Sequence, residues 1–420
     1  MLHVNHMVFA SSILPCPSSS PSSSRTAIAS CSSTRHFFNF GFNPKWLPIN
    51  PNQSRTLSFG YRYRPVSFCA LKDVKSSSSP SRNGNAFEFD VVIIGAGIIG
   101  LTIARQFLIG SDLSVAVVDK AVPCSGATGA GQGYLWMAHK SPGSDIWELA
   151  LRSQRLWEGL AETLRDQGLN PSEELGWKKT GSLLIGRTPD ELDMLKRKVK
   201  QLSGAGLEAE YLSSVDLLSM EPALLIGDSC GAAFLPNDCQ LDAYSTAAFI
   251  QKGHLLVIEN FNSLHVNHGL MEVGYVNHQA LTLAKDFEQT SSVSMTATMD
   301  VQGNLILGSS REFAGFNTEM NEFIVARIWE RASEFFPTLK EVSLSDIKHS
   351  SKVRIGLRPY MLDGKPVIGP VPGLSNVFLA SGHEGGGLSL AMGTAEMIGN
   401  MVLGSPGKVD PAPFLLQGRC

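Results

Sequence analysis

Hydrophobic positions form a short, nearly continuous run over residues 90–94, which is followed by a glycine. A short apolar run without alternation is typical of a strand buried on both faces of a parallel sheet. Residues 98–109 have the length of a helix, and residues 114–119 form a second short run. The pattern predicts a strand–helix–strand unit with parallel strands. The apolar stretch is too short to span a membrane, because Arg105 interrupts it.

Two longer segments show the spacing of amphipathic helices. Residues 144–164 place their apolar side chains on one stripe, with Ser144 as the expected N-cap. Thr188 opens the sequence Thr-Pro-Asp-Glu, a capping box with proline at the first helical position, which predicts a helix over residues 188–202. A strand is predicted between them over residues 182–185. The stripe of the first helix consists of Ile146, Leu149, Leu156, Trp157, Leu160 and Leu164.

The C-terminal half contains further strand and helix signals. Two runs within residues 295–307 flank Val-Gln-Gly, which predicts a β-hairpin. A helix over residues 319–336 is expected to stop at Pro337, since proline cannot continue it. A short strand at residues 377–380 precedes a cluster of glycines and a helix over residues 388–403.

Composition adds a contrast between the two ends of the chain. The 420 residues suffice for two domains with hydrophobic cores. The formal net charge is −3, but residues 1–72 hold seven basic residues and no Asp or Glu. The remainder therefore carries −10 (−3 less +7), which disfavours nucleic acid or another polyanion as a partner. The seven cysteines form no CxxC pair, so we predict neither a metal site nor a dithiol redox site.

The acid-free N-terminal stretch is rich in Ser and Pro, a composition typical of an organelle transit peptide. Residues 66–70 read Val-Ser-Phe-Cys-Ala, which resembles a plastid processing site. We therefore predict a chloroplast transit peptide over residues 1–70, followed by a disordered Ser-rich linker over residues 71–86. A mitochondrial presequence is the nearer alternative, although no basic residue precedes Arg25; a disordered basic tail is the other.

Residues 95–100 read Gly-Ala-Gly-Ile-Ile-Gly, a GxGxxG pattern between a predicted strand and a predicted helix. In such a turn Gly95 makes the tight bend, Gly97 lets the backbone approach a pyrophosphate, and Gly100 permits close helix–strand packing. Asp119 ends the second strand, where a carboxylate accepts hydrogen bonds from a ribose hydroxyl and repels the 2′-phosphate of NADP. The unit predicts a dinucleotide site and leaves FAD and NAD both open.

A loop of small residues follows this unit. Residues 125–133 read Ser-Gly-Ala-Thr-Gly-Ala-Gly-Gln-Gly, and such a loop can wrap phosphates and a ribityl chain with its backbone N–H groups. Taken alone, the loop is equally compatible with a flexible surface connection.

Three motifs near the C-terminus narrow the choice. They read Gly-Leu-Arg-Pro-Tyr at 356–360, Asp-Gly-Lys-Pro-Val-Ile-Gly-Pro at 363–370 and Ser-Gly-His-Glu-Gly-Gly-Gly-Leu at 381–388. Together with the strand–helix–strand unit and the glycine-rich loop, in this order, they resemble the D-amino-acid oxidase and glycine oxidase family. The resemblance covers roughly residues 87–404, apart from one internal departure.

The resemblance implies an α/β fold class with an α+β substrate domain. A discontinuous Rossmann-type FAD-binding domain would comprise residues 87–170 and 374–405, incomplete near 251–253, beside an antiparallel-sheet substrate domain over 171–373. The implied activity is FAD-dependent oxidation of the C–N bond of an amino acid or secondary amine. Residues 382–390 contain no Cys for a covalent flavin link, so non-covalent FAD is expected.

For the cofactor, the resemblance implies two groups of contacts. The ADP half would be held by Gly95, Gly97, Gly100, Asp119 and Lys120. A helix that begins at Leu388 would aim its positive end at the preceding glycines and stabilise negative charge on the reduced flavin, with a packing helix of small residues as the alternative. His383 is expected to position this loop through its backbone, without a role as catalytic base. The flavin side of the site would consist of Thr128, Gly129, Gly131, Gly382, His383, Gly386, Gly387 and Leu388.

For the substrate, the resemblance implies that Arg358 clamps a carboxylate through two parallel hydrogen bonds. A structural salt bridge is the alternative role of this arginine. Tyr275 and Tyr360 are the expected active-site hydroxyls, with core aromatics as the equal alternative. The substrate Cα–H would pass as hydride to flavin N5, the imine would hydrolyse in water, and O₂ or another acceptor would take the electrons.

The chain departs from the family pattern in the middle of its sequence, where a segment is missing. In the family, several dozen residues return to the flavin domain and complete its sheet before the chain crosses to the substrate sheet. Here the predicted helix over residues 244–251 runs through two residues into a predicted strand over 254–259. The loss would leave sheet backbone groups unpaired. The alternative function is therefore an inactive or unstable shortened isoform without flavin. An NAD-dependent dehydrogenase is a third hypothesis, disfavoured by the motif at 382–388.

Overall fold

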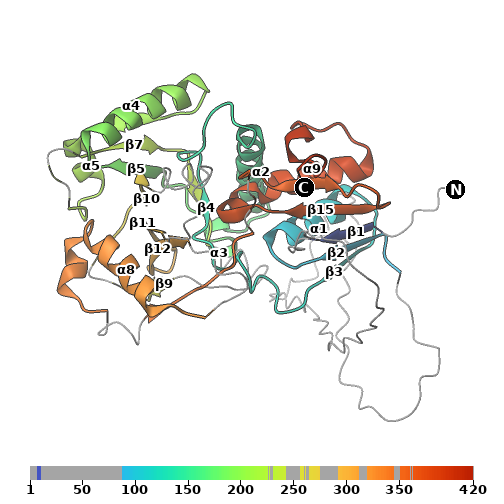
Figure 1. Ribbon diagram of the computed structural model, residues 1–420, viewed down its shortest axis with the longest axis horizontal. Helices are drawn as coiled ribbons and strands as arrows, with labels where there is room; N and C mark the ends of the chain where they lie inside the picture. The colour runs from blue at the N-terminus through green and yellow to red at the C-terminus, as the bar shows by residue number, and fades with distance from the viewer. Residues whose placement is uncertain are drawn as a thin grey trace, which may run out of the picture. The chain divides into compact units, whose positions relative to one another are not determined.

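The predicted strand–helix–strand unit opens the folded body of the protein (Figure 1). In the computed structural model, β2 (Val91–Ile94) leads through a glycine turn into α1 (Ile98–Gly110), and the chain returns in β3 (Val115–Val118). The two strands are parallel, with Val91 opposite Val115. Val91 and Ile93 are fully buried on one face, whereas Val92 is half-buried and Ile94 is 42% exposed on the other, so the prediction of a strand buried on both faces was wrong. The predicted order of strand, helix and strand and their parallel pairing are confirmed.

The structure describes residues 7–10, 88–225, 227, 230–242, 256–259, 261, 264–274, 292–311, 319–344, 351–359, 361 and 363–419. The predicted helix over residues 244–251 and its junction with the next strand lie outside these residues. The predicted linker over 71–86 and most of the predicted transit peptide do so as well. The elements described here belong to the unit formed by Met1–Pro17 and Phe89–Cys420.

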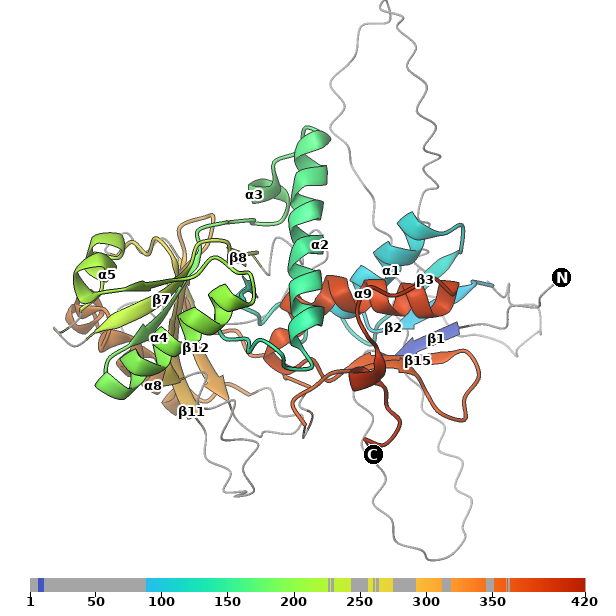
Figure 2. The same cartoon turned by 90° about the horizontal axis from the view of Figure 1, so that it is seen from above.

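The first sheet has five strands in the order β14-β15-β1-β2-β3. β14 (Val367–Pro370) and β15 (Val377–Ser381) form an antiparallel pair from the C-terminal part of the chain. β1 (Met7–Ala10) lies between β15 and β2 and is parallel to both. α9 (Gly387–Leu403) packs along α1, and α2 (Trp147–Asp166) packs on α9. Figure 2 shows both α1 and α9 on one side of this sheet.

The second sheet has eight strands in the order β13-β9-β12-β11-β10-β5-β7-β6. Every neighbouring pair is antiparallel except β10 and β5, which are parallel. The expected antiparallel sheet is therefore mixed at this pair, because the long connection from β5 to β10 allows a crossover where a tight hairpin would not. In chain order the strands are β5 (Ser182–Gly186), β6 (Glu210–Leu212), β7 (Gly231–Leu235), β9 (Leu256–Ile258), β10 (Gly269–Glu272), β11 (Ser292–Met299), β12 (Leu305–Arg311) and β13 (Ser351–Lys352).

Alternating residues of β5 separate the two faces of the second sheet. Leu184 packs in a cluster with Leu195 of α4 (Pro189–Gly204). Leu183 and Ile185 point to the opposite face, in a cluster with Trp329 of α8 (Glu322–Ser333). α5 (Ser214–Met220) contributes Leu217 to the same cluster as α8. Because successive side chains of a strand point to opposite faces, these clusters lie on opposite sides of the sheet, which is thus covered on both faces.

Two short elements connect the glycine-rich loop to the second sheet. β4 (Tyr134–Leu135) follows the loop and pairs antiparallel with β8 (Cys239–Gln240). Gly133 approaches this pair closely, since a Cβ there would lie 1.7 Å from the carbonyl oxygen of Leu241. The remaining short helices are α3 (Pro171–Glu174) and the 3₁₀ helices η1 (Pro337–Glu341), η2 (Glu384–Gly386) and η3 (Ala412–Phe414).

Local signals predicted most helix ends. The capping box is present at α4, where Thr188 Oγ1 accepts from the Glu191 N–H at 3.3 Å and the Glu191 carboxylate accepts from the Thr188 N–H at 3.1 Å. The start of α2 was predicted wrongly at Ser144, because the Ser144 hydroxyl donates backwards to the Ser141 carbonyl and the helix begins only at Trp147. Asn321 caps α8, which is shorter than predicted at both ends.

Candidate active site

The turn between β2 and α1 has the conformation that its three glycines allow. Gly95 adopts φ 108°, and its N–H donates to the Val118 carbonyl at 2.7 Å. A Cβ at Gly100 would lie 2.0 Å from the carbonyl oxygen of Gly95, so only glycine fits there. Gly97 is the N-cap of α1, which has no side-chain cap and no acidic residue in its first turn. The positive end of α1 is therefore available to an anion.

Two side chains face this turn. The Asp119 carboxylate accepts hydrogen bonds from the N–H groups of Ala96 at 2.6 Å and Ala121 at 2.9 Å. Thr128 Oγ1 accepts from the Ile98 N–H at 3.0 Å, in the first turn of α1. The structure thus brings the predicted ribose acid and the predicted loop threonine to the same turn. Lys120, the next predicted contact, is exposed.

The glycine-rich loop also reaches the start of α9. Its turn is closed by the Gly131 N–H, which donates to the Thr128 carbonyl at 3.0 Å. A Cβ at Gly131 would lie 2.6 Å from the Leu388 side chain, so loop and helix are in close contact. α9 begins after Gly386 without a side-chain cap and without an acid in its first turn. A second uncapped helix N-terminus therefore faces this region, as predicted from the glycine cluster.

His383 is buried just before α9. Its Nε2 lies 3.0 Å from the Thr394 hydroxyl oxygen, one of the two being the donor. Burial lowers the pKa of His383 to about 3, so the ring is neutral at physiological pH. A ring with so low a pKa is too weak a base to take a proton from substrate, and its contact with Thr394 of α9 suits a structural support of the loop. The positioning role expected from the sequence stays a prediction.

The segment with Arg358 lies between the two loops. The Glu384 N–H donates to the Pro359 carbonyl at 3.1 Å. On the other side, a Cβ at Gly356 would lie 2.2 Å from the Ala130 side chain. Arg358 itself is half-buried, and it has no hydrogen-bond or ion-pair partner among the described residues. The nearby Glu384 carboxylate pairs with Arg311. Tyr275 and Tyr360 lie outside the described residues.

Two polar residues near these loops were not among the predicted contacts. The Gln132 Oε1 accepts from the Thr296 hydroxyl of β11 at 2.7 Å, while its buried Nε2 has no partner among the described residues. Burial lowers the pKa of Lys140 to about 8, and the carboxylates of Glu384 and Asp238 oppose that shift. A polar side chain in a loop otherwise made of small residues was the only sequence signal for Gln132.

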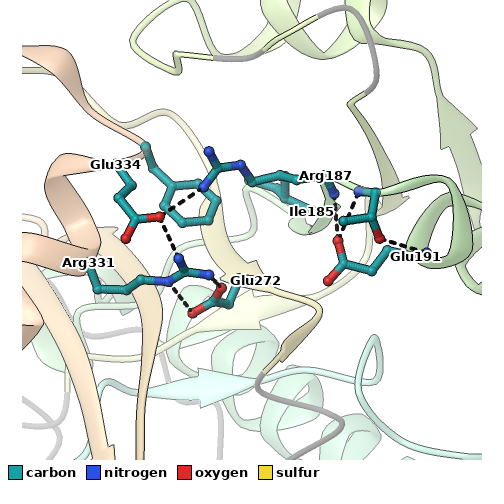
Figure 3. A pocket seen from close by; sticks show the side chains of 8 residues that line it. Ile185, Arg187, Glu191, Glu272, Arg331 and Glu334 are labelled. Carbon is teal, nitrogen blue, oxygen red and sulfur yellow. Dashed lines mark hydrogen bonds and ion pairs between the residues drawn. The ribbon is translucent and has the colours of Figure 1, made fainter.

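A separate cluster of charged side chains lies on the second sheet and surrounds a cavity of about 330 Å³ (Figure 3). Arg331 pairs with both Glu272 and Glu334, and Arg187 reaches Glu334 at 3.3 Å. The Glu191 carboxylate accepts hydrogen bonds from the backbone N–H groups of Arg187 and Thr188, just before α4. Each labelled charge thus has a partner, so the cluster is a structural network and offers no unpaired group to a ligand.

The described ranges offer neither a membrane-spanning helix nor a metal site. None of the helices there is long and apolar enough to cross a membrane. In the same residues, no group of three or more His, Cys, Asp or Glu side chains could hold a metal ion. The prediction of a dinucleotide site therefore rests on the two uncapped helix ends and the loops between them.

Comparisons with known proteins agree with this geometry. The family model described as FAD dependent oxidoreductase (DAO) matches residues 90–255 and 263–401. The glycine oxidase of Geobacillus kaustophilus is 25% identical over 375 aligned positions, covering 78% of this chain and 96% of that protein. The glycine oxidase of Pseudomonas aeruginosa is 25% identical over 380 positions, covering 78% and 99%. The crystal structure of the Geobacillus enzyme has a TM-score of 0.64 at 21% identity, covering 79% of this chain and 99% of that one.

The aligned lengths also show that this chain is shorter inside the matched region. In the Geobacillus alignment, 78% of 420 residues is about 328, so about 47 of the 375 positions have no counterpart here. The family match is divided between residues 255 and 263. The junction predicted at 251–254 itself lies outside the described residues. With a family model that matches most of its length and a fold shared with solved glycine oxidase, the chain belongs to the FAD dependent oxidoreductase family of enzymes.

Proposed function

We propose that the protein oxidises the C–N bond of a small amino acid or secondary amine, with non-covalently bound FAD. The observation that carries this proposal is Arg358: a half-buried guanidinium without a counter-ion among the described residues, between two glycine-rich loops. A cation in that setting suits a substrate carboxylate, which its planar fork binds through two hydrogen bonds. The glycine oxidase names of two relatives support an amino-acid substrate.

The described residues fit both the ADP half and the flavin half of FAD. The N–H groups at the start of α1 would meet the pyrophosphate, once the Thr128 hydroxyl releases the Ile98 N–H. Asp119 would accept from the ribose hydroxyls in place of the Ala96 N–H. The uncapped start of α9 would face the flavin ring, where it favours negative charge. When bound, FAD supplies the acceptor for the hydride that leaves the substrate.

The chain's own side chains would then bind and orient. Arg358 fixes the carboxylate, and the Gln132 Nε2, buried without a partner among the described residues, can donate to a bound acceptor atom. Neutral His383 holds the loop before α9 and leaves the site without an added positive charge. The reacting amine must be neutral when its Cα–H leaves as hydride, because the nitrogen lone pair forms the C=N bond, and no protein base is required once it is neutral.

The test is a visible absorption spectrum of the purified full-length protein, repeated under anaerobic conditions with glycine, sarcosine or a D-amino acid. Flavin bands that bleach with one of these compounds would support the proposal, and reoxidation with air or with an artificial acceptor would distinguish O₂ from another carrier. Flavin bands that none of these amines bleaches would contradict the substrate class.

A second candidate is a shortened form that binds no flavin. It is favoured by the roughly 47 aligned positions without a counterpart in this chain. A colourless protein that gains flavin only when those residues are restored would establish it. For the N-terminal stretch we propose a chloroplast transit peptide, with a mitochondrial presequence as the alternative. Imaging residues 1–86 fused to a fluorescent protein decides between them.

A further inference from the structure

The first sheet contains a strand that the body of the chain does not supply. β1 (Met7–Ala10) lies between β2 and β15 and is parallel to both, with Met7 opposite Val91 and Val8 opposite Val377 (Figure 2). This strand comes from the N-terminal stretch that we expect to be a transit peptide. No strand from residues 88–419, as far as the structure describes them, occupies that position.

The packing of two helices keeps β2 and β15 far enough apart to leave room for one strand between them. α1 follows β2, and α9 follows β15 through the glycine loop. The helices pack directly on each other: the Thr102 hydroxyl donates to the Ala391 carbonyl at 3.3 Å, and a Cβ at Gly399 would lie 2.9 Å from the Gln106 side chain. Because neighbouring strands lie about 4.8 Å apart, β2 and β15 are separated by roughly twice that distance and cannot pair with each other.

We propose that residues Met7–Ala10 act as a surrogate central strand, so that the full-length chain folds its first sheet around its own N-terminal segment. Met-Val-Phe-Ala is apolar at four consecutive positions, as central parallel strands are. About 47 of the 375 aligned positions have no counterpart in this chain, so it has less sequence from which to build that strand. Processing near residue 70 would remove the strand and open the sheet between β2 and β15.

The hydrogen bonds of β2 make the inference testable at single amides. The Val91 N–H donates to the Ser114 carbonyl at 3.0 Å and the Gly95 N–H to the Val118 carbonyl at 2.7 Å, both toward β3. Backbone N–H groups along a strand point alternately to its two neighbours. The Ile93 amide therefore points toward β3, and the amides of Val92 and Ile94 point toward β1.

The experiment is amide hydrogen exchange on the full-length chain, on a chain that starts at Leu71, and on the Phe9→Pro variant. Proline removes a ladder hydrogen bond from a central strand. We expect the Val92 and Ile94 amides to exchange at least about tenfold faster in the last two proteins, while Val91 and Ile93 keep their protection. Phe42→Pro, the same replacement elsewhere in the N-terminal stretch, is the matched control and should leave all four amides unchanged.

A peptide of residues 1–17, added to the Leu71 chain, should restore protection, whereas the peptide with Phe9→Pro should not. If the shortened chain unfolds, so that all four amides exchange alike, recovery with the natural peptide supports the inference and no recovery overturns it. Unchanged exchange at Val92 and Ile94 in the Leu71 chain would overturn it. Protection found only in a dimeric fraction, where a second copy supplies the strand, would also overturn the inference. The readout requires no flavin, so it stands apart from the proposed function.

Discussion

At the scale of single residues, Arg358 differs from three other half-buried arginines of the described body. Arg152, Arg331 and Arg419 each have a carboxylate partner, and their charges are neutralised locally. Arg358 has none among the described residues, although it is only half exposed. A partly desolvated cation without a partner costs free energy that a substrate carboxylate can recover on binding.

Replacing this arginine should therefore separate substrate binding from cofactor binding. We expect Arg358→Ala to raise KM for a carboxylate substrate about 100-fold, since a charged bidentate pair contributes about 3 kcal/mol. The flavin spectrum should stay as in the unchanged protein. Steady-state kinetics with an amino acid and with a carboxylate-free amine test this, because the second substrate should be little affected. An equal loss with both amines would argue against the carboxylate role.

The requirement for glycine around the start of α1 can be tested by adding a Cβ atom. A Cβ at Gly100 meets the Gly95 carbonyl oxygen at 2.0 Å, so Gly100→Ala should push the turn apart and abolish FAD retention. Gly159, on α2, has nothing within 4 Å of an added Cβ. Gly159→Ala is the matched control and should stabilise the protein by about 0.5–1 kcal/mol. Thermal unfolding and the flavin-to-protein absorbance ratio measure both effects.

His383 should make the protein sensitive to acid. Its folded-state pKa is lowered from 6.5 to about 3, so the neutral ring stabilises the fold above pH 6.5 and this contribution is lost as the pH falls toward 3. Relative to His383→Gln, the protein should lose about 2 kcal/mol of unfolding free energy between pH 7 and pH 5. Urea unfolding of both proteins at the two pH values tests this; parallel losses would contradict it.

At the scale of elements, the charged network of Figure 3 holds α8 against the second sheet. Glu272 is buried at the end of β10, and its carboxylate accepts from Arg331 of α8 and from the Met295 N–H of β11. The guanidinium of Arg331 also lies over the Phe335 ring at 5.4 Å. One buried carboxylate thereby connects three elements, and its loss would leave a backbone donor unpaired and Arg331 with only Glu334 as a carboxylate partner.

Glu272→Gln should accordingly destabilise the protein by about 2–3 kcal/mol, a value reduced from that of a fully buried pair because Arg331 is partly exposed. Glu334, whose side chain is 47% exposed, is the matched control in the same network. Glu334→Gln should change the unfolding free energy by about 0.5 kcal/mol or less. Chemical denaturation of the two variants compares them, and similar losses would show that burial does not set the difference.

At the scale of the whole molecule, the candidate site is made where parts distant in the sequence meet. The glycine-rich loop contacts α9 through Gly131 and Leu388, and it contacts the second sheet through Gln132 and Thr296. The Arg358 segment joins the loop before α9 through the Pro359 carbonyl. A ligand in this region would therefore contact loops that connect to both sheets. Its binding should stabilise the two sheets together.

Cofactor binding should then appear as stability. We expect FAD at 100 times its Kd to stabilise the full-length protein by about 2.7 kcal/mol. A chimera in which the internal segment of the Geobacillus glycine oxidase is inserted after residue 251 should bind FAD more tightly. Differential scanning fluorimetry with and without FAD measures both proteins. No shift for the natural chain and a clear shift for the chimera would favour the flavin-free shortened form.

Short-range signals in the sequence predicted the strand–helix–strand unit, the hairpin of β11 and β12, the capping box at Thr188 and the end of α9 at Gly404, where φ is 68°. Each depends on residues a few positions apart, whose sterics and hydrogen bonds act whatever the rest of the chain does. The resemblance of the C-terminal motifs also identified the family correctly. The roles of the individual site residues stay predictions.

Only the tertiary structure decided what depends on partners far away in the chain. Ser144 has the chemistry of a cap but bonds to Ser141, and β5 and β10 pair in parallel across a long connection. The neutral state of His383 follows from burial, and the availability of Arg358 from the absence of an ion-pair partner among the described residues. β1 is the clearest case: four apolar residues predict no strand by themselves, and they form one because the rest of the sheet leaves a place with unpaired backbone on both sides.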